Sequence, residues 1–186
     1  DGAVKYRVFR KKGTESWTRI ADTGSTNYTD RSAASGTTYA YTVRCIKADG
    51  KLASDYDKNG KSLIRLSTGN VKSIANAAKG MRLTWTKING AQGYIIYRAY
   101  GSGAYKAIKT ITSGTTLNYT DTSATVNGGK YSYAVCGYRG SVKGAYTGKS
   151  YYCLTQNRIS SVTNSAAGRA TVAWSQNAKA TGYQVN

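Results

Sequence analysis

The sequence predicts an all-β protein built from tandem β-sandwich domains, and three observations lead to that prediction. Strand-forming residues dominate the composition: 17 tyrosines occur with many threonines and valines, and glycine and asparagine separate them. Short segments alternate apolar and polar side chains with the period of a half-buried strand, and turn residues lie between them. Similar segments return after about 88 or 89 residues, so the fold repeats along the chain.

The clearest strand pair lies in residues 81–98. Leu83 and Trp85 alternate with polar residues, an Asn-Gly turn follows, and a β-branched and aromatic run begins at Tyr94. Trp174 and Tyr183 repeat the tryptophan and the tyrosine 89 residues later. This pair of strands is therefore a unit that the chain uses more than once.

The N-terminal part contains only the later strands of such a unit. We expect strands at residues 5–11, 16–20 and 36–45, a turn at Asp49-Gly50, and a last strand that ends near residue 66. In the strand 36–45, alternation places four side chains on one inward face. These four are Tyr39, Tyr41, Val43 and Cys45.

The next 90 residues replay this order and add two strands in front, between Val71 and Trp85. Residues after 156 contain those front strands again, up to Tyr183. We therefore divide the chain into a partial repeat (1–66), a complete repeat (67–156) and the start of a third (157–186). The links between them are too short for free tumbling, which predicts a semi-rigid rod of neighbouring repeats.

These motifs resemble the fibronectin type III domain. The similarity is carried by the Leu-Thr-Trp of residues 83–85, the run at 90–98 and the Gly-Thr-Thr-Tyr of residues 36–39. It implies seven strands per repeat, with strands C to G in 1–66, A to G in 67–156, and A, B and the start of C in 157–186. It also implies a tyrosine corner at Tyr39 and Tyr131, in which the hydroxyl bonds a nearby backbone group. The chain departs from the family in having no proline.

Exposed apolar residues are expected at both ends of this repeat pattern. Residues 1–66 lack the first two strands, and residues 157–186 contain them, so Val43 and Trp174 would face solvent. Two explanations remain open: the sequence is cut from a longer array, which we favour, or one copy donates its strands to the next.

Positive charge is concentrated in the C-terminal two thirds. Residues 1–57 have a net charge of +3, whereas residues 58–186 carry seventeen Lys/Arg and the single acid Asp121, giving +16. Such a field attracts anionic glycans, cell-wall polymers and, without sequence specificity, nucleic acid. A charged surface that only keeps the protein soluble is the alternative.

The composition argues against catalysis and against bound metals or cofactors. The chain has no histidine, so histidine-dependent nucleophilic triads and the usual zinc sites are excluded. The complete repeat has only Asp121 where a glycosidase needs two carboxylates, and we interpret Asp121 as a turn residue like Asp30. We expect a non-enzyme without cofactors, and no run is long enough to span a membrane as a helix.

Cys136 and Cys153 form a disulfide if the hairpin between their strands turns at Gly144-Ala145, because the two residues would then lie opposite each other. Two exposed thiols are the alternative. Cys45 falls on the inward strand face and is expected to be a small core residue.

Aromatic and basic residues alternate in the complete repeat and predict a binding face. The candidates are Tyr100, Tyr105, Lys106, Lys109, Tyr138, Arg139, Lys143 and Tyr151. The Arg-Gly-Ser that starts at Arg139 has serine where an integrin-binding Arg-Gly-Asp has aspartate, so that activity is not expected.

Three functions are compatible with these features. The first is a spacer or stalk in a bacterial surface or secreted protein, because the composition resembles repeats of Gram-positive extracellular proteins. The second is an adhesin-type module that binds an anionic glycan, a cell-wall polymer or a host surface protein. The third is an accessory domain of a polysaccharide-degrading or wall-lytic enzyme.

Overall fold

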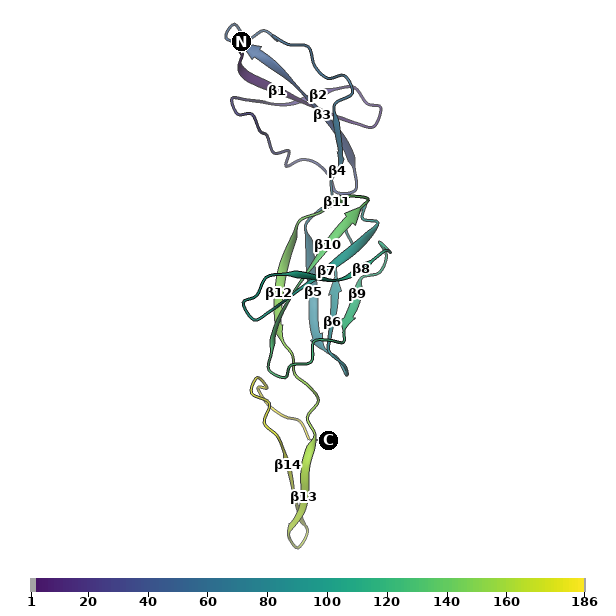
Figure 1. The fold of residues 1–186 in the computed structure, drawn as a ribbon, viewed down its shortest axis with the longest axis vertical. Coiled ribbons are helices and arrows are strands. Elements are labelled where there is room, and N and C mark those ends of the chain that lie inside the picture. The colour runs from purple at the N-terminus through teal and green to yellow at the C-terminus, as the bar shows by residue number, and fades with distance from the viewer. Residues whose placement is uncertain (1–2, 186) are drawn as a thin grey trace.

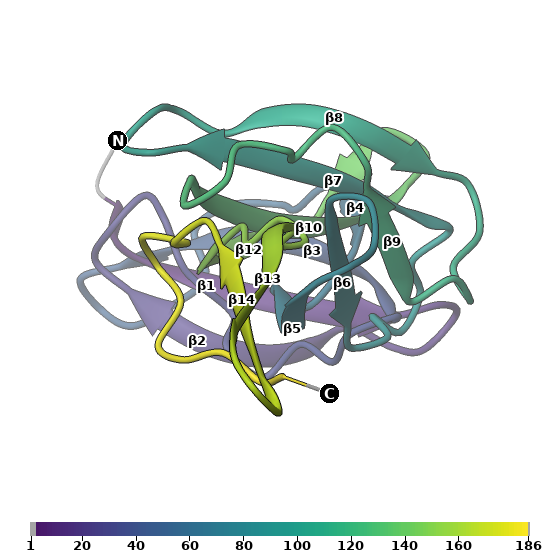
Figure 2. The same cartoon turned by 90° about the horizontal axis from the view of Figure 1, so that it is seen from below.

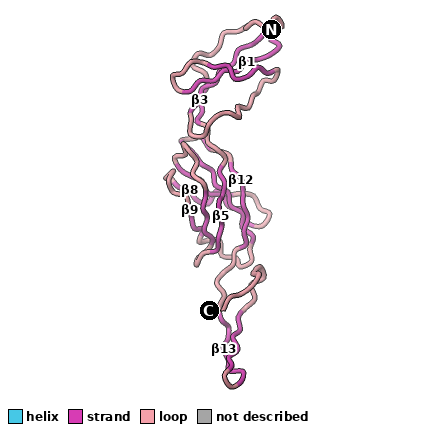
Figure 3. Tube along the Cα trace, turned by 180° about the vertical axis from the view of Figure 1, so that it is seen from behind, coloured by secondary structure: helices cyan, strands magenta, loops and turns pink. Residues whose placement is uncertain are grey.

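The chain forms an extended all-β rod. A computed structural model describes residues 3–185, and within that range it contains fourteen strands and no helix. The strands lie in three groups along the long axis, which we name the first segment (3–66), the second segment (67–156) and the third segment (157–185) (Figure 1). Loops connect strands throughout, and the end-on view shows the segments stacked behind one another (Figures 2 and 3). The predicted all-β sandwich class is confirmed.

The first segment is a single antiparallel sheet. Its strands are β1 (Ala3–Lys12), β2 (Thr18–Thr23), β3 (Thr38–Lys47) and β4 (Lys61–Ile64), in the order β2-β1-β3-β4. One face carries an apolar groove of about 630 Å³, where Val43 remains 47 % exposed and Leu63 55 %. No second sheet within residues 3–66 covers this face, as the missing front strands predicted. Tyr39 at the end of the face is nevertheless buried.

The second segment is a complete two-layer sandwich. Its strands are β5 (Gly69–Asn76), β6 (Met81–Trp85), β7 (Gly93–Tyr100), β8 (Lys106–Ile111), β9 (Asn118–Asp121), β10 (Lys130–Arg139), the two-residue β11 (Val142–Lys143) and β12 (Tyr146–Tyr152). One layer has the order β8-β7-β10-β12 and the other β5-β6-β9. The layers join where the start of β12 pairs in parallel with the start of β5.

The core between these layers is made by the residues that strand alternation assigns to it. The predicted core set is buried, with none of its members more than 4 % exposed: Trp85, Tyr94, Ile96, Tyr131, Tyr133 and Val135. The Trp85 and Tyr94 rings meet edge to face, with centroids 5.4 Å apart. Burial of large aromatic and branched side chains is the main stabilising contribution here.

The tyrosine corners are also present. The Tyr39 hydroxyl accepts a hydrogen bond from the backbone N–H of Ala34, and the Tyr131 hydroxyl accepts one from Val126, both at 3.3 Å. Each bond fastens the loop before the strand to the strand itself.

The third segment begins with a hairpin of β13 (Ile159–Ala166) and β14 (Arg169–Trp174). Trp174 packs on Tyr183 with ring centroids 5.6 Å apart. Trp174 is half-buried, unlike its counterpart Trp85, because no second layer covers the hairpin within residues 157–185. Ile159 and Val162 of β13 remain more than 60 % exposed.

Candidate functional site

Three tyrosines gather on the outer face of the second segment, the side of β7, β10 and β12 that faces away from the core. The rings of Tyr97 and Tyr146 stack with centroids 4.8 Å apart, and Tyr105 meets Tyr146 nearly edge-on at 6.1 Å. Tyr105 lies directly over Gly148, where any side chain would collide with its hydroxyl. Ala134 beneath the cluster is fully buried although it faces away from the core. We call these tyrosines the second aromatic cluster.

The first segment has an equivalent group, the first aromatic cluster. Phe9 and Trp17 precede Tyr97 and Tyr105 by 88 residues, and Trp17 meets Tyr56 edge-on with centroids 6.5 Å apart. A glycine again lies beneath: a Cβ at Gly60 would lie 2.6 Å from the Trp17 ring. The sandwich therefore places an aromatic cluster on the same outer face in both segments.

The two clusters differ in charge and shape. In the first, Lys11 Nζ lies 4.7 Å from the centre of a Trp17 ring, and the Arg44 guanidinium lies 5.4 Å from that of Tyr56. Phe9, Trp17, Arg44 and Tyr56 line a cleft of about 200 Å³. Cation–π contacts of this kind orient the charge and leave part of it in water.

The predicted binding residues divide between faces of the second segment. Tyr105 belongs to the second aromatic cluster, and Lys106 follows it on β8 as an exposed side chain. Lys109 on β8 and Lys143 on β11 are also exposed. β8 pairs with β7 so that Lys106 lies opposite Arg98 and Lys109 opposite Ile96, and both of these partners point toward the core. Lys106 and Lys109 therefore lie on the other side of the sheet from the ring of Tyr105, whereas Lys143 lies opposite Tyr138 of β10.

Tyr100 and Tyr151 lie on the opposite side of the same sheet. Both pair in register with Tyr131 of β10, whose side chain points into the core, and both are about half exposed. Adjacent strands place paired side chains on one face. Tyr100 and Tyr151 are therefore separated from Tyr105 by the thickness of the sheet.

Tyr138 and Arg139 lie near the junction with the first segment. The Tyr138 ring packs against Gly93, and Arg139 Nη1 donates a hydrogen bond to the carbonyl oxygen of Gly90 at 3.3 Å. The eight predicted residues thus do not form one continuous platform in the structure.

The expected disulfide between Cys136 and Cys153 is absent, and both thiols are free. The predicted strand register was wrong: β10 pairs with β12 so that Lys130 lies opposite Tyr152. Cys153 therefore follows the end of the paired region, near the start of β10, whereas Cys136 lies far along that strand. The hairpin turns earlier than predicted: Arg139 pairs with Val142, so the turn lies at Gly140-Ser141 and not at Gly144-Ala145.

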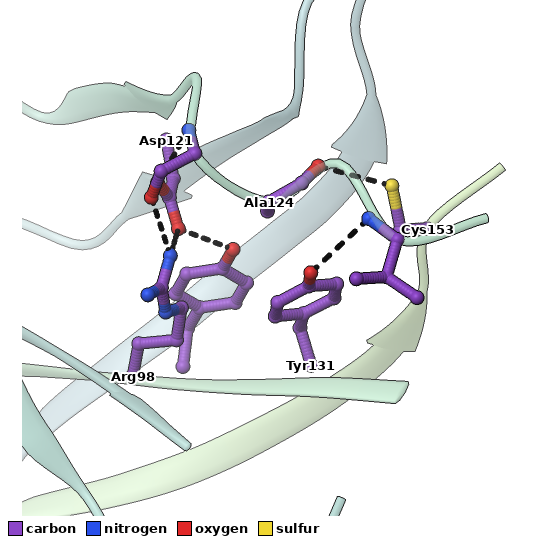
Figure 4. A network of polar contacts seen from close by, with 8 residues as sticks. Arg98, Asp121, Ala124, Tyr131 and Cys153 are labelled. Atoms are coloured by element: carbon purple, nitrogen blue, oxygen red, sulfur yellow. Dashed lines mark hydrogen bonds and ion pairs between the residues drawn. The ribbon is translucent and has the colours of Figure 1, made fainter. Parts of the chain in front are cut away.

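The alternative of two exposed thiols is also wrong, because Cys136 and Cys153 are each at most 2 % exposed. Cys136 Sγ donates to the carbonyl oxygen of Gly144, and Cys153 Sγ donates to that of Ala124 (Figure 4). Burial raises the pKa of both thiols. Both cysteines are inert packing residues.

A buried polar network connects the two layers of the second segment (Figure 4). Asp121, at the end of β9, accepts hydrogen bonds from Arg98 Nη1 and from the Tyr133 hydroxyl, both at 2.8 Å. It also accepts from the backbone N–H and the hydroxyl of Ser123. Sequence reasoning interpreted Asp121 as a turn residue, and the structure makes it an ionic crosslink as well.

The electrostatics of this network follow from burial and hydrogen bonding. Burial alone would raise the pKa of Asp121, but hydrogen bonds from Ser123, Tyr133 and Arg98 outweigh it and leave the pKa lowered. Burial, followed by the bond to Asp121, raises the pKa of Tyr133. Asp121 is therefore ionised, and Tyr133 donates its proton to it.

The first segment repeats this network residue by residue. Asp30 accepts hydrogen bonds from Arg10, Tyr41 and Ser32 at 2.7–2.9 Å. Burial opposes ionisation of Asp30, but the bonds from Ser32, Arg10 and Tyr41 lower its pKa to about 2. Burial and the bond to Asp30 raise the pKa of Tyr41 to about 12. The shared Arg, Asp and Tyr positions were the sequence signal that could have revealed both networks.

Loops also connect the segments to each other. At the first junction Ser35 Oγ donates to the carbonyl oxygen of Asn89 at 3.1 Å and accepts from the backbone N–H of Ser67 at 2.9 Å. The backbones of Gly36 and Gly90 approach so closely that a Cβ on either would contact the other loop. The loop before β3 thus packs on the loop between β6 and β7.

The second junction uses the corresponding loops one repeat later. Asn177 Nδ2 donates to Asn127 Oδ1 at 2.6 Å, and Lys179 Nζ lies 5.3 Å from the centre of the Tyr152 ring. Asn127 follows Ser35 by 92 residues, the same spacing that relates the two corner tyrosines. The loop before β10 therefore contacts the loop after β14, as the loop before β3 contacts the loop after β6.

Comparisons with known proteins give a fold likeness only. No family model matches the chain, and no curated protein matches it. Among solved structures, it is similar to the FN1–FN3 domains of chicken CNTN1, with 13 % identity, a TM-score of 0.40, and coverage of 81 % of this chain and 54 % of that one. It is also similar to a two-domain fibronectin type III segment of chicken tenascin, with 15 % identity, a TM-score of 0.41, and coverage of 80 % and 83 %.

The described residues lack two kinds of feature. Residues 3–185 contain no group of three or more His, Cys, Asp or Glu side chains that could hold a metal ion. The same range has no helix with the length and apolar character needed to cross a membrane.

Proposed function

We propose that the chain is a non-catalytic spacer in an extracellular multidomain protein, of the kind found on bacterial surfaces. The units are residues 1–66, 67–156 and 157–186, and their neighbours in the rod are repeats of the same type. The observation that carries this proposal is the use of equivalent loops at both junctions, with a side-chain hydrogen bond across each. A junction repeated in this way holds successive repeats at a similar angle and distance, which is what a stalk requires.

Small-angle X-ray scattering of the 186-residue chain tests this proposal. A four-residue Gly-Ser insertion after Ser67 would separate the first junction, and the same insertion after Gly101, in an exposed turn of the second segment, is the matched control. The native chain and the control should scatter as the same rod, whereas the junction insertion should broaden the distance distribution. Equal scattering from all three would refute a rigid junction.

A second candidate function is binding of an anionic glycan or cell-wall polymer. It is favoured by one observation: the only acid in residues 58–185 is Asp121, which is 2 % exposed and paired with Arg98, so the exposed charged side chains of that range are all positive. Lys106, Lys109 and Lys143, which are exposed on β8 and β11, would supply part of this field. A long polyanion would bind mainly through release of its counterions.

Titration with heparin at several salt concentrations tests the second candidate. The logarithm of the affinity should fall linearly with the logarithm of the salt concentration, and changing Lys106, Lys109 and Lys143 together to Gln should reduce the slope by about 2–3. Lys5, Lys12 and Lys47 changed together to Gln are the charge-matched control in the first segment. Absence of heparin binding even at low salt would refute the second candidate and leave the spacer function as the only proposal.

A further inference from the structure

The first aromatic cluster encloses a cleft whose lining comes from four different parts of the first segment. Phe9 lies on β1, Trp17 in the β1–β2 connection, Arg44 on β3, and Tyr56 in the loop before β4. All four side chains are only partly exposed. The cleft, at about 200 Å³, is large enough for one small ring and too small for a folded partner.

The chemistry of the lining favours one class of ligand. Aromatic rings offer flat apolar surfaces against which the C–H face of a sugar ring can pack. Arg44 adds a planar cation over the Tyr56 ring, and its Nε donates to the carbonyl oxygen of Ser54 at 3.0 Å. Its two terminal nitrogens suit a carboxylate, because an N–H group of each can bind one of the two oxygens. We propose that this cleft binds an acidic sugar, a uronic acid unit of a short or terminal saccharide.

Comparison of the two segments separates this site from ordinary packing of a sheet face. If the aromatic residues served only to cover the sheet, both clusters would need the same kinds of side chain. The position of Arg44 corresponds to Cys136 in the second segment, 92 residues later, where the thiol is buried and bonded to a carbonyl. The cation and the cleft therefore occur together in the first segment, on a scaffold that folds without that cation in the second.

The surrounding charge points to a single acidic unit rather than a long polyanion. Glu15, Asp55 and Asp57 are exposed in the same two loops that supply Trp17 and Tyr56. These carboxylates repel a chain of many negative charges. One carboxylate placed against Arg44, with the sugar ring on the aromatic side chains, avoids that repulsion.

The test uses the 186-residue chain and two probes, a hyaluronan tetrasaccharide and the same tetrasaccharide with its carboxyl groups reduced to alcohols. Saturation-transfer NMR detects contact, and chemical-shift titration gives the affinity. We expect saturable binding of the acidic probe and binding at least about tenfold weaker for the reduced one, since a charge-assisted bond of this type is lost. Absence of saturable binding, or equal affinity for both probes, would overturn the proposal.

Two substitutions locate the site. Arg44→Gln should weaken binding of the acidic probe at least about tenfold, and Arg44→Lys should weaken it less because the charge remains. Arg139→Gln removes an exposed positive charge from the second segment and should change the affinity less than about twofold. Circular dichroism confirms folding of each variant. Equal losses for Arg44→Gln and Arg139→Gln would assign binding to general charge and refute the cleft.

Discussion

Replacing Asp121 by Asn tests whether the buried network is an ionic crosslink of the sandwich. The side chain is 2 % exposed and connects β9 of one layer to Arg98 and Tyr133 of the other. Asn keeps the size of the side chain and one acceptor oxygen but removes the charge. Arg98 would then be left partly buried without its counterion.

The expected cost follows from these contacts. Removing one partner of a buried ion pair typically costs about 3–5 kcal/mol. The Arg98 side chain is 26 % exposed, so water can solvate part of its charge. We therefore expect a cost at the lower end of this range. The structure therefore predicts that Asp121→Asn lowers the free energy of unfolding of the second segment by about 3 kcal/mol at neutral pH.

The pH dependence gives a second, independent readout. The pKa of Asp121 is lowered in the folded state, so its stabilisation is complete above the unfolded value of 3.8 and is lost as the pH falls through the folded pKa. Wild-type protein should thus lose stability below about pH 4. Asp121→Asn should lose less over the same interval, because it removes the only acid in residues 58–185.

Urea unfolding at pH 7 and pH 3 measures both effects. In a Trp17→Phe, Trp174→Phe background, Trp85 is the one remaining tryptophan and reports the core of the second segment alone. The crosslink would be refuted if Asp121→Asn lowered the free energy of unfolding by less than about 0.5 kcal/mol at pH 7. It would also be refuted if the effect of the substitution were the same at pH 7 and pH 3.

Other predictions concern packing. Trp85→Ala should destabilise the second segment by about 3–5 kcal/mol in the same urea assay, because it empties the centre of the core. Gly148→Val should lower the melting temperature in calorimetry, because its side chain would displace Tyr105. Gly24→Val is the control: this exposed glycine also lacks a positive φ, and a Cβ there would meet no atom within 4 Å, so the melting temperature should change little. Cys136 and Cys153 should react with a thiol reagent only after denaturation, and rapid reaction of the folded protein would contradict their burial.

The sequence predicted the features that depend on local alternation and on the repeat. Trp85 and Tyr94 could be assigned to the core because period-two patterning determines which strand face is apolar, and that face must be buried. The tyrosine corners at Tyr39 and Tyr131 were implied by the resemblance to the fibronectin type III domain, and the hydrogen bonds of both hydroxyls agree with it.

Features that depend on strand register or on irregular loops could not be obtained in this way. The disulfide prediction failed because the hairpin turns at Gly140-Ser141 and not at the predicted Gly144-Ala145, so Cys153 falls past the end of the pairing between β10 and β12. The first aromatic cluster was missed because Tyr56 lies in a loop without period, so nothing in the sequence placed it beside Trp17. The sequence grouped Tyr105 and Tyr151 as candidates for one binding face, and nothing in their spacing showed that they lie on opposite sides of the sheet.

The repeat explains why the two polar networks occur although burying charge is costly. An apolar pair would hold two layers together at least as well, so stability alone does not favour Arg98 and Asp121. The hydrogen bonds of the Arg98–Asp121 pair with Tyr133 and Ser123 can all form in one geometry only. Arg98 and Tyr133 both donate to Oδ2 of Asp121, and Ser123 donates to Oδ1. A chain of similar repeats has many near-equivalent strand pairings available, and wrong pairing would leave a buried charge unmatched. We infer that the network at Asp121, like the one at Asp30, selects the correct strand register in its own segment.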